Sequence, residues 1–340
     1  MKRRRWPRRI AIGLVALCAI LATAVIALRT PDIPVATLRA KYASPASQFI
    51  ALEPGTALHL RDEGPRDGLP VILLHGSNAS LHTWEPWRAR LNAAGYRVIT
   101  LDFPGHGLSS PVPSRDYSNE AYVRVVEQVA ARLGLSRFVL GGNSMGGGVS
   151  WLYAHRHPEQ VAALILVDAS GQPAPKGQDL PLGFRLARTP VLRTIGEVIT
   201  PRAMIEKSLK QSVSVQESAT PAVVDRYWEL LLYPGNRGAT LDRFGSYVKN
   251  RSRDPGPLNV PAAIIWGQDD KLIPVASAAW FSARLPQGRV TILDNVGHLP
   301  MEEAPDRSLR PVLELLAAVQ QPPPPQGAGD RGVSLSTAPR

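Results

Sequence analysis

The stretch VLGGNSMGGGVS, residues 139–150, places one serine, Ser144, among five glycines directly after a short apolar run. Residues 142–146 read Gly-Asn-Ser-Met-Gly, a G-x-S-x-G pattern. In this pattern the serine occupies a strained turn between a strand and a helix, and only small residues fit two positions before and after it. A G-x-G-x-x-G dinucleotide motif is absent from this stretch, because Asn143 stands where the second glycine after Gly141 should be, and no G-x-x-x-x-G-K-[ST] phosphate loop occurs in the sequence. The stretch therefore predicts a nucleophilic serine presented at the edge of a sheet.

Apolar runs rich in Val, Ile and Leu recur on both sides of this stretch. They lie at residues 71–75, 97–102, 137–142, 161–168, 262–267 and 289–293. Short, nearly uninterrupted apolar runs are typical of strands that are buried on both faces. Helical patterns separate them at residues 84–94, 118–133 and 145–157. This alternation predicts an α/β fold, with a mostly parallel central sheet flanked by helices.

The alternation is interrupted once, between residues 171 and 258. This region has helix-like stretches at 204–211 and 221–232 but no apolar strand-like run. We therefore expect a helical cap, inserted after the sixth strand and lying over one end of the sheet. The core would then consist of residues 48–170 and 259–318.

The amino-terminal residues 1–29 predict a membrane anchor or a signal segment. Six Lys or Arg lie within the first nine residues, and Ile10 to Leu28 are 19 residues without a charge. A membrane-spanning helix needs about 20 apolar residues, whereas the apolar core of a cleavable signal peptide has roughly 7 to 15. The length favours a retained anchor, and cleavage near Ala22-Thr23-Ala24 with secretion is the alternative. Because basic flanks stay in the cytoplasm, the catalytic domain is expected outside it, in the periplasm of a bacterium.

Two further segments have compositions of their own. Residues 30–47 contain three prolines and are predicted to link the anchor to the domain. Residues 319–340 are rich in Pro, Gln, Gly and Ser without apolar periodicity, which predicts a disordered tail.

The net charge of +11 comes from two regions of the 340-residue chain. The first nine residues contribute six charges, and residues 171–258 contribute five, from 13 basic and 8 acidic residues. The remaining 20 basic and 20 acidic residues cancel. Because no basic stripe with interleaved aromatic residues is present, we expect no nucleic-acid partner. The spacing of His, Cys, Asp and Glu gives no metal-ligand pattern, and neither a metal nor a cofactor is expected.

A nucleophilic serine needs a histidine base and a carboxylate that orients the base. Three histidines follow Ser144 in the chain. His155 and His157 lie on the helix that leaves the serine turn and point away from its start. His298, in a turn after the strand at 289–293, is therefore the predicted base.

The acid is expected at the end of a strand before this histidine, and the strand at 262–267 is followed by Asp269 and Asp270. Spacing alone does not separate these two aspartates. Asp168, at the end of an earlier strand, is a third candidate, whose other possible role is a turn or a helix cap.

Together these motifs resemble the α/β-hydrolase superfamily over residues 48–318, in the capped branch that holds esterases, lipases, epoxide hydrolases, dehalogenases and C–C hydrolases. The blocks that carry the resemblance are Leu-His-Gly-Ser at 74–77, Asp-Phe-Pro-Gly-His-Gly-Leu-Ser at 102–109, Gly-Asn-Ser-Met-Gly at 142–146, and Trp-Gly-Gln-Asp-Asp at 266–270 with Gly-His at 297–298.

The resemblance assigns further roles. It implies that Asp270, three residues after the glycine of W-G-x-x-D, is the acid. It also implies an oxyanion hole formed by the backbone N–H groups of Ser77 and Met145, and a structural turn around His106. Because Ser144 stands where epoxide hydrolases and haloalkane dehalogenases carry aspartate, those two activities are not expected.

The expected activity is hydrolysis of a carboxylic ester with an apolar acyl group, through an acyl-enzyme on Ser144. The sequence is similar to monoacylglycerol lipases with one amino-terminal helix. Apolar cap residues that we expect to wall the pocket are Phe184, Leu186, Val191, Leu192, Ile195, Trp228, Leu231 and Leu232. The surplus of positive charge in the cap would suit anionic lipid headgroups. The alternatives are a C–C hydrolase of ring-cleavage products, which the Gly-Asn-Ser-Met-Gly-Gly string also resembles, and a non-catalytic binding protein.

Overall fold

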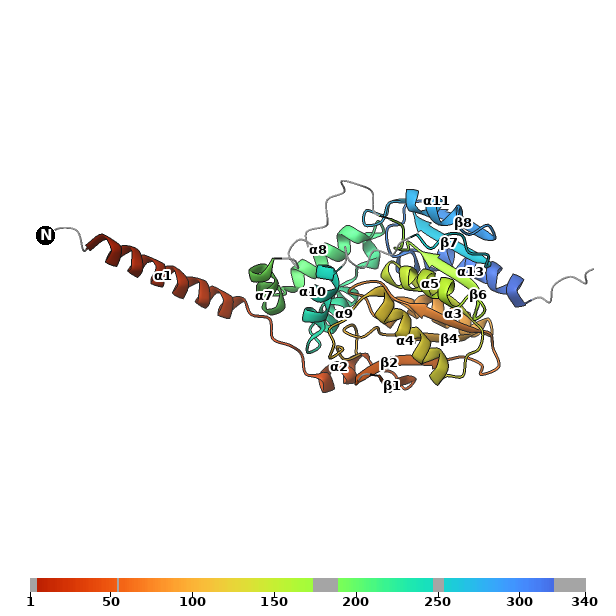
Figure 1. The fold of residues 1–340 in the computed structure, drawn as a ribbon, viewed down its shortest axis with the longest axis horizontal. Coiled ribbons are helices and arrows are strands. Elements are labelled where there is room, and N and C mark those ends of the chain that lie inside the picture. Colours follow the sequence, from red (N-terminus) through yellow and green to blue (C-terminus); the bar gives the residue numbers. More distant parts are fainter. Residues whose placement is uncertain (1–4, 54, 174–188, 247–253, 321–340) are drawn as a thin grey trace, which may run out of the picture.

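The structure is a computed structural model that describes residues 5–53, 55–173, 189–246 and 254–320 (Figure 1). Its centre is one eight-stranded sheet in the order β1-β2-β4-β3-β5-β6-β7-β8. The strands are β1 (Ser47–Leu52), β2 (Thr56–Glu63), β3 (Pro70–Leu74), β4 (Arg97–Leu101), β5 (Phe138–Asn143), β6 (Val161–Val167), β7 (Ala262–Gly267) and β8 (Gly288–Leu293). Strands β3 to β8 are parallel, and β2 pairs antiparallel with both β1 and β4. The predicted α/β fold with a mostly parallel sheet is confirmed.

Helices cover both faces of this sheet (Figure 1). They are α3 (Glu85–Ala93), α4 (Asn119–Arg132), α5 (Met145–Arg156), α11 (Ala276–Ser282), α12 (Pro300–Glu303) and α13 (Pro305–Gln320), with a 3-10 turn η1 (Leu81–Trp84) before α3. Neighbouring residues of one strand face opposite sides, as a pleated strand requires. Leu164 packs in the cluster that includes α4, α5 and α11, whereas Ile165 packs in the cluster that includes α3 and α13. The sheet is therefore buried on both faces, which explains its uninterrupted apolar runs.

In the described parts of the region between β6 and β7, the helices are α7 (Pro190–Val198), α8 (Arg202–Ser212), α9 (Pro221–Leu231) and α10 (Asn236–Ser246), with a 3-10 turn η2 (Gln216–Ser218). Helix α8 packs on α9, and α7 packs on α10. We call this region the cap segment. Two of the apolar residues expected to wall a pocket, Phe184 and Leu186, lie outside the described residues, as do residues 321–340 of the predicted tail.

The other expected pocket residues of the cap segment differ in their surroundings. Leu192 and Ile195 are exposed, and Leu232 is buried. The Trp228 indole donates a hydrogen bond to the carbonyl of Thr200 at 2.8 Å. At least part of this apolar set therefore holds the cap segment together.

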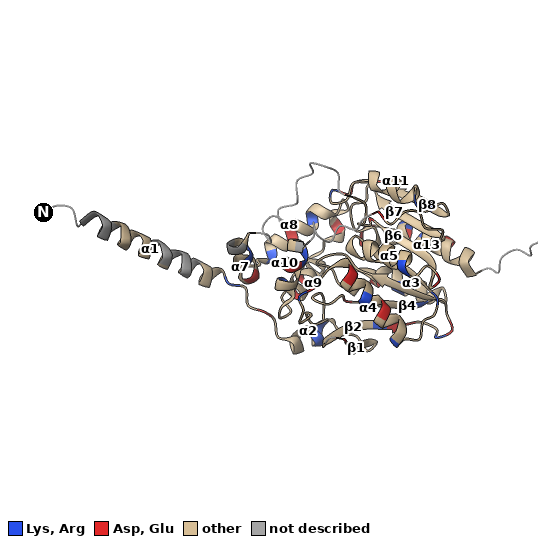
Figure 2. Ribbon diagram, in the orientation of Figure 1, with Lys and Arg blue, Asp and Glu red and all other residues tan. Residues whose placement is uncertain are grey.

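Basic and acidic residues are interspersed along the ribbon of the domain (Figure 2). Several basic residues of the cap segment have acidic partners. Arg193 pairs with Asp242 at 2.7 Å, and Arg202 pairs with Asp225 at 2.5 Å. Both acidic partners are among the eight acids already counted in this region, so its surplus of positive charge is unchanged by these ion pairs.

The amino-terminal helix α1 (Arg5–Leu28) extends away from the domain (Figure 1). It covers the residues predicted to span a membrane. Among the helices that the structure describes, however, none combines the length and the apolar character that a membrane crossing requires. The predicted membrane span over Ile10 to Leu28 is therefore not supported.

The segment predicted as a linker contains a second helix, α2 (Val35–Tyr42). Its Leu38 is buried in a small cluster with Leu108, Leu230 and Tyr233. The backbone N–H of Ile33 also donates to the carbonyl of Leu232 at 2.9 Å. Because Leu38 packs in a cluster that includes a residue of α9, the segment predicted as a linker is attached to the domain.

Candidate active site

Ser144 lies at the turn between β5 and α5 and has φ 51° and ψ −115°. This backbone conformation is strained for a residue with a side chain. Its backbone N–H donates to the carbonyl of Val167 at 3.0 Å, and its carbonyl accepts from the N–H groups of Gly148 and Ser170 at 3.1 and 2.9 Å. These bonds hold the turn in the conformation that the G-x-S-x-G pattern predicts.

The two flanking glycines allow this turn to close. A methyl group on Gly142 would lie 2.2 Å from the carbonyl carbon of Gly146. One on Gly146 would lie 2.2 Å from the carbonyl oxygen of Leu74, at the end of β3. Both distances are far shorter than van der Waals contact, so a side chain at either position would displace the backbone around Ser144.

His298 and Asp270 form a buried pair. Nδ1 of His298 lies 2.8 Å from Oδ2 of Asp270. The other carboxylate oxygen, Oδ1, accepts from the backbone N–H groups of Leu272 and Ile273 at 2.7 and 3.0 Å. Since Nδ1 faces the carboxylate, Nε2 is the nitrogen that remains to take a proton from a nucleophile. Among the hydrogen bonds of the described residues, none joins Oγ of Ser144 to His298.

Asn143, the residue before the candidate nucleophile, connects the two loops. Its Nδ2 donates to the carbonyl of His298 at 3.0 Å and to the carbonyl of Val167 at 3.2 Å. The backbone N–H of His298 donates to the carbonyl of Ser212 at 2.9 Å, at the end of α8. The end of β5, the histidine loop and the cap segment therefore meet around His298.

Glu303 of α12 is a site residue that the sequence analysis missed. Its carboxylate accepts hydrogen bonds from the backbone N–H groups of Gly297 and Leu299, on both sides of the histidine, at 2.9 and 3.0 Å. It also accepts from Ser214 and Val215 of the cap segment at 2.7 and 3.0 Å. The signal in the sequence is the pair Glu302-Glu303, four and five residues after the histidine. Glu303 holds the histidine loop in place.

The residues expected to form the oxyanion hole lie beside Ser144. Met145 is the first residue of α5, so its backbone N–H has no acceptor within the helix. The loop after β3 approaches from the other side, since a methyl group on Gly76 would lie 3.2 Å from Cβ of Ser144. Oγ of Ser77 also contacts Sδ of Met145 at 3.5 Å. The N-terminus of α5 and the loop with Ser77 thus flank the serine.

A buried network fixes that loop. Asp102 accepts hydrogen bonds from the N–H groups of Leu81 and Leu108 at 2.7 and 2.8 Å and lies 2.7 Å from Nδ1 of His59. Burial raises the pKa of Asp102, but the interactions with His59 outweigh it and bring the pKa below its usual range. Burial lowers the pKa of His75, whose Nε2 accepts from the N–H of Phe103 at 2.9 Å. The block at 102–109 is thus a scaffold for the residues after β3.

The structure distinguishes the three candidate acids. Asp270 contacts His298, whereas Asp269 is exposed and accepts from Oγ of Ser214 at 3.1 Å. Asp168 is fully buried beside the pair, and polar atoms of Asp168, Asp270 and His298 lie within 4.8 Å of one another. Three such groups can in principle bind a cation. Here Asp270 and His298 are already bonded to each other, which favours a catalytic pair.

The remaining histidines are placed elsewhere. His157 directly follows α5, and its Nε2 lies 2.8 Å from Oε1 of Glu127, whereas His155 packs edge-on against Trp151. His106 is buried against His75, with ring centroids 5.2 Å apart. Burial lowers the pKa of His106 to about 3, so this ring stays neutral.

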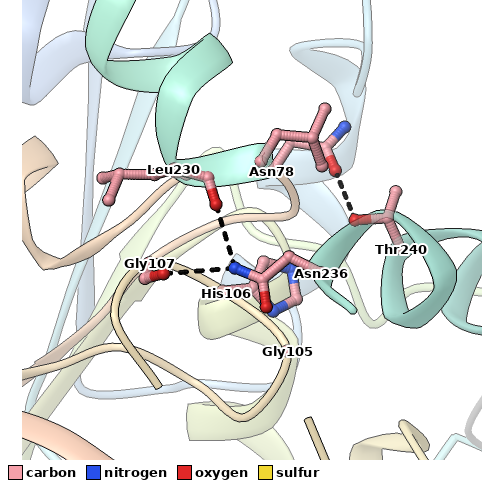
Figure 3. A pocket seen from close by; sticks show the side chains of 9 residues that line it. Asn78, Gly105, His106, Gly107, Leu230, Asn236 and Thr240 are labelled. Atoms are coloured by element: carbon pink, nitrogen blue, oxygen red, sulfur yellow. Dashed lines mark hydrogen bonds between the residues drawn. The ribbon is translucent and has the colours of Figure 1, made fainter. Parts of the chain in front are cut away.

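The cap segment contacts the loop that follows Ser77. Oγ1 of Thr240, on α10, donates to Oδ1 of Asn78 at 3.2 Å (Figure 3). Nδ2 of Asn236 donates to the carbonyls of Gly107 and Leu230 at 3.1 and 2.9 Å (Figure 3). A small cavity of about 10 Å³ lies at this junction. Helix α10 is therefore hydrogen-bonded to Asn78, the residue next to Ser77.

A comparison with known families matches residues 70–305 to the family described as alpha/beta hydrolase fold. The match spans more than half of the chain and contains Ser144, Asp270 and His298. The chain belongs to this family. The hydrolase has the mostly parallel eight-stranded sheet of this fold, and the cap segment is inserted between strands β6 and β7.

Relatives of this hydrolase include a lipase and a dienedioate hydrolase. It is 28% identical to Lipase 1 of Psychrobacter immobilis over 76% of this chain and 80% of the relative. It is also 28% identical to a 2-hydroxy-6-oxononadienedioate/2-hydroxy-6-oxononatrienedioate hydrolase of Burkholderia vietnamiensis. This match covers 80% of this chain and 96% of the relative. A solved membrane phospholipase A, described as a bacterial virulence factor, is similar with a TM-score of 0.69 and 26% identity over 93% of this chain and 100% of that one.

Proposed function

We propose that the protein hydrolyses carboxylic esters of apolar acids through an acyl-enzyme on Ser144. The observation that carries the proposal is the hydrogen bond from Asn143 to the carbonyl of His298, which brings a strained serine turn next to a buried His298–Asp270 pair. Serine, histidine and aspartate in these roles are the parts that acyl transfer needs.

The reaction follows from this arrangement. Oγ of Ser144 attacks the ester carbonyl while Nε2 of His298 takes its proton, and the Asp270 carboxylate stabilises the resulting imidazolium. The negative charge on the former carbonyl oxygen is met by the backbone N–H groups of Met145 and Ser77. The imidazolium then gives its proton to the departing alcohol, which leaves the acyl group on Ser144.

The second half repeats the same proton transfers with water. A water molecule gives a proton to His298 and attacks the acyl carbonyl, and the carboxylic acid leaves as Oγ of Ser144 recovers that proton. Water and ester are consumed, and one acid and one alcohol are released. The serine, the histidine and the aspartate end in the states in which they began.

Hydrolysis of p-nitrophenyl esters of graded chain length tests the proposal. The purified protein should release p-nitrophenol with a preference for apolar acyl chains, and Ser144→Ala should lose about 10⁴-fold or more in kcat. Turnover that survives in Ser144→Ala would refute the acyl-enzyme.

A second candidate is hydrolysis of a C–C bond in a ring-cleavage product. The similarity to the dienedioate hydrolase over 96% of its length favours it. The two candidates share the serine, the histidine and the aspartate, so a substrate comparison separates them. Turnover of a ring-cleavage dienoate, with simple esters left intact, would favour this candidate over the esterase.

We also propose that residues 1–29 direct the catalytic domain out of the cytoplasm. The support is the basic cluster that precedes an uncharged run of 19 residues. A retained segment would keep the protein at the membrane, and a cleaved one would release it. Cell fractionation of the full chain, with protease treatment of intact cells lacking an outer membrane, tests this. A protease-protected protein in the cytoplasmic fraction would contradict it.

A further inference from the structure

Asp168 follows β6 and has no role in the mechanism above, yet it lies at the centre of the site. Its side chain is completely buried, and its φ of 44° is in the left-handed region that residues with side chains avoid. Oδ1 accepts from the backbone N–H of Gly267, at the end of β7, at 2.9 Å. The strained backbone and this bond turn the carboxyl group towards Asp270.

The two oxygens of Asp168 differ in their partners. Whereas Oδ1 has the Gly267 amide, Oδ2 is buried and receives no hydrogen bond from an N–H or O–H group of any described residue. An ionised carboxylate with such an oxygen would bear the full cost of desolvation. A protonated carboxyl group avoids this cost because it uses the second oxygen as a donor. The acceptor is Asp270, since a side-chain hydrogen bond between the two carboxyl groups is one of the causes that raise the pKa of Asp168.

The charges around Asp168 also favour the neutral form. Asp270 and Glu303 are both acidic, and the third neighbour, His298, is already paired with Asp270. Two buried carboxylates this close cannot both be ionised without strong repulsion. Burial and the charge of Asp270 raise the pKa of Asp168 well above its usual range. Asp270 is the better site for the negative charge, since it accepts from the Leu272 and Ile273 amides and from His298.

We propose that Asp168 is a neutral positioning residue, whose carboxylic acid donates a hydrogen bond to the Asp270 carboxylate and sets how strongly that carboxylate supports His298. The proton stays on Asp168 throughout the reaction. Donation from Asp168 adds a further donor to the Leu272 and Ile273 amides and His298, and so withdraws negative charge from the Asp270 carboxylate. The imidazolium of His298 is then held less tightly, and the histidine is free to act as a base at lower pH.

The effect that we expect Asp168 to have on ester hydrolysis rests on the proposed function, whereas its protonation state does not. The protonation state itself is visible without activity, because a protonated carboxyl group has a C=O infrared stretch distinct from that of a carboxylate. Difference spectra at neutral pH between the full-length protein and Asp168→Asn should contain one such band. Ser144→Ala should retain it. Absence of the band from the unmodified protein would overturn the proposal.

The kinetic test compares the pH dependence of kcat/KM for an ester substrate in Asp168→Ala and Asp168→Asn. Alanine removes the donor, so the acidic midpoint should move to higher pH by about half a unit or more. Asparagine keeps both hydrogen bonds, because its carbonyl can accept from Gly267 and its amide can donate to Asp270. It should therefore fold even if alanine does not, and its midpoint should move less.

Asp269→Asn is the matched control, since it removes a carboxylate next to Asp270 from an exposed position, and its midpoint should stay unchanged. A move to lower pH in Asp168→Ala would mean that Asp168 carries negative charge and would overturn the proposal. An unchanged midpoint in both Asp168 variants would overturn the positioning role. If the infrared band is present but no variant or parent hydrolyses esters, the proposed function fails while the neutral Asp168 stands.

Discussion

Nδ2 of Asn143 donates a hydrogen bond to the backbone carbonyl of His298 at 3.0 Å, across 155 residues of sequence. This bond joins the strand end that carries the nucleophile to the loop that carries the base. The same side chain also reaches the carbonyl of Val167, at the end of β6. One amide group therefore sets the spacing of loops that follow β5, β6 and β8.

We predict that Asn143→Ala lowers kcat by about 10- to 100-fold with a small change in KM, since a displacement of about 1 Å at a reacting group costs up to about 10²-fold. Steady-state kinetics on a p-nitrophenyl ester measure this. Asn259→Ala, at an exposed position that accepts from Gln287, is the control and should keep its kcat. Equal kcat values for the two variants would show that the bond to His298 has no part in positioning.

We predict that Gly76→Ala impairs the oxyanion hole. The added methyl group would lie 2.8 Å from Oδ1 of Asn143 and 3.2 Å from Cβ of Ser144, so the loop with Ser77 must move away from the serine. Loss of one oxyanion donor costs about 10²- to 10³-fold in kcat, and we expect a loss of this order with KM little changed.

Gly238→Ala, in α10, is the matched control for this substitution. Its methyl group would have one neighbour, 3.8 Å away, so kcat should not change. A Gly76→Ala variant with the kcat of this control would argue against an oxyanion hole at Ser77.

We predict that Glu303→Gln destabilises the fold as well as the site. Glutamine replaces one accepting oxygen by an NH₂ group that faces the amides of Gly297, Leu299, Ser214 and Val215. Buried donors left without an acceptor cost about 1 to 3 kcal/mol. Urea unfolding should report a loss of this size, and Glu314→Gln on the exposed side of α13 should report none. Equal unfolding free energies would contradict this role for Glu303.

We predict that Asp168→Asn changes the pH dependence of stability. Asp168 keeps its proton in the folded chain to a higher pH than in the unfolded chain, so folding takes up a proton once the pH exceeds the ordinary value of 3.8. The stability of the unmodified protein therefore falls as the pH rises from that value through the raised folded pKa. The free energy involved is about 1.4 kcal/mol for each unit of pKa displacement.

Asparagine lacks this proton uptake, so Asp168→Asn should gain stability relative to the unmodified protein as the pH rises above about 4. Urea unfolding at several pH values measures the difference. A difference in unfolding free energy that is the same at all these pH values would contradict a raised pKa at Asp168.

The sequence predicted Ser144 and His298 because each sits in a short motif at the end of a recognisable strand. Asp269 and Asp270 remained open on spacing alone, and the family resemblance favoured Asp270, which the structure places against His298. The roles of Asn143, Glu303 and Asp168 were not predictable in the same way. Their partners are backbone groups or side chains far away in the sequence, and no local pattern records those contacts.

Strand β1, at one edge of the sheet, and helix α2, in the segment before it, were also not predicted, for a different reason. Uninterrupted apolar runs identify strands buried on both faces, but β1 begins with two polar residues, Ser47 and Gln48, and has one buried residue, Leu52. Helix α2 has one buried side chain, Leu38, between proline-containing stretches. Such short elements are stabilised mainly by tertiary contacts, which composition does not reveal.

The most direct test of the account is covalent labelling with a serine-reactive fluorophosphonate, followed by mass spectrometry of the peptides. We predict one adduct, on Ser144, with loss of ester hydrolysis in proportion to labelling. We also predict greatly reduced labelling in His298→Ala, because this variant has no histidine to take the proton of Ser144. An unlabelled Ser144 in folded protein, or undiminished hydrolysis after Ser144 is fully modified, would contradict these predictions.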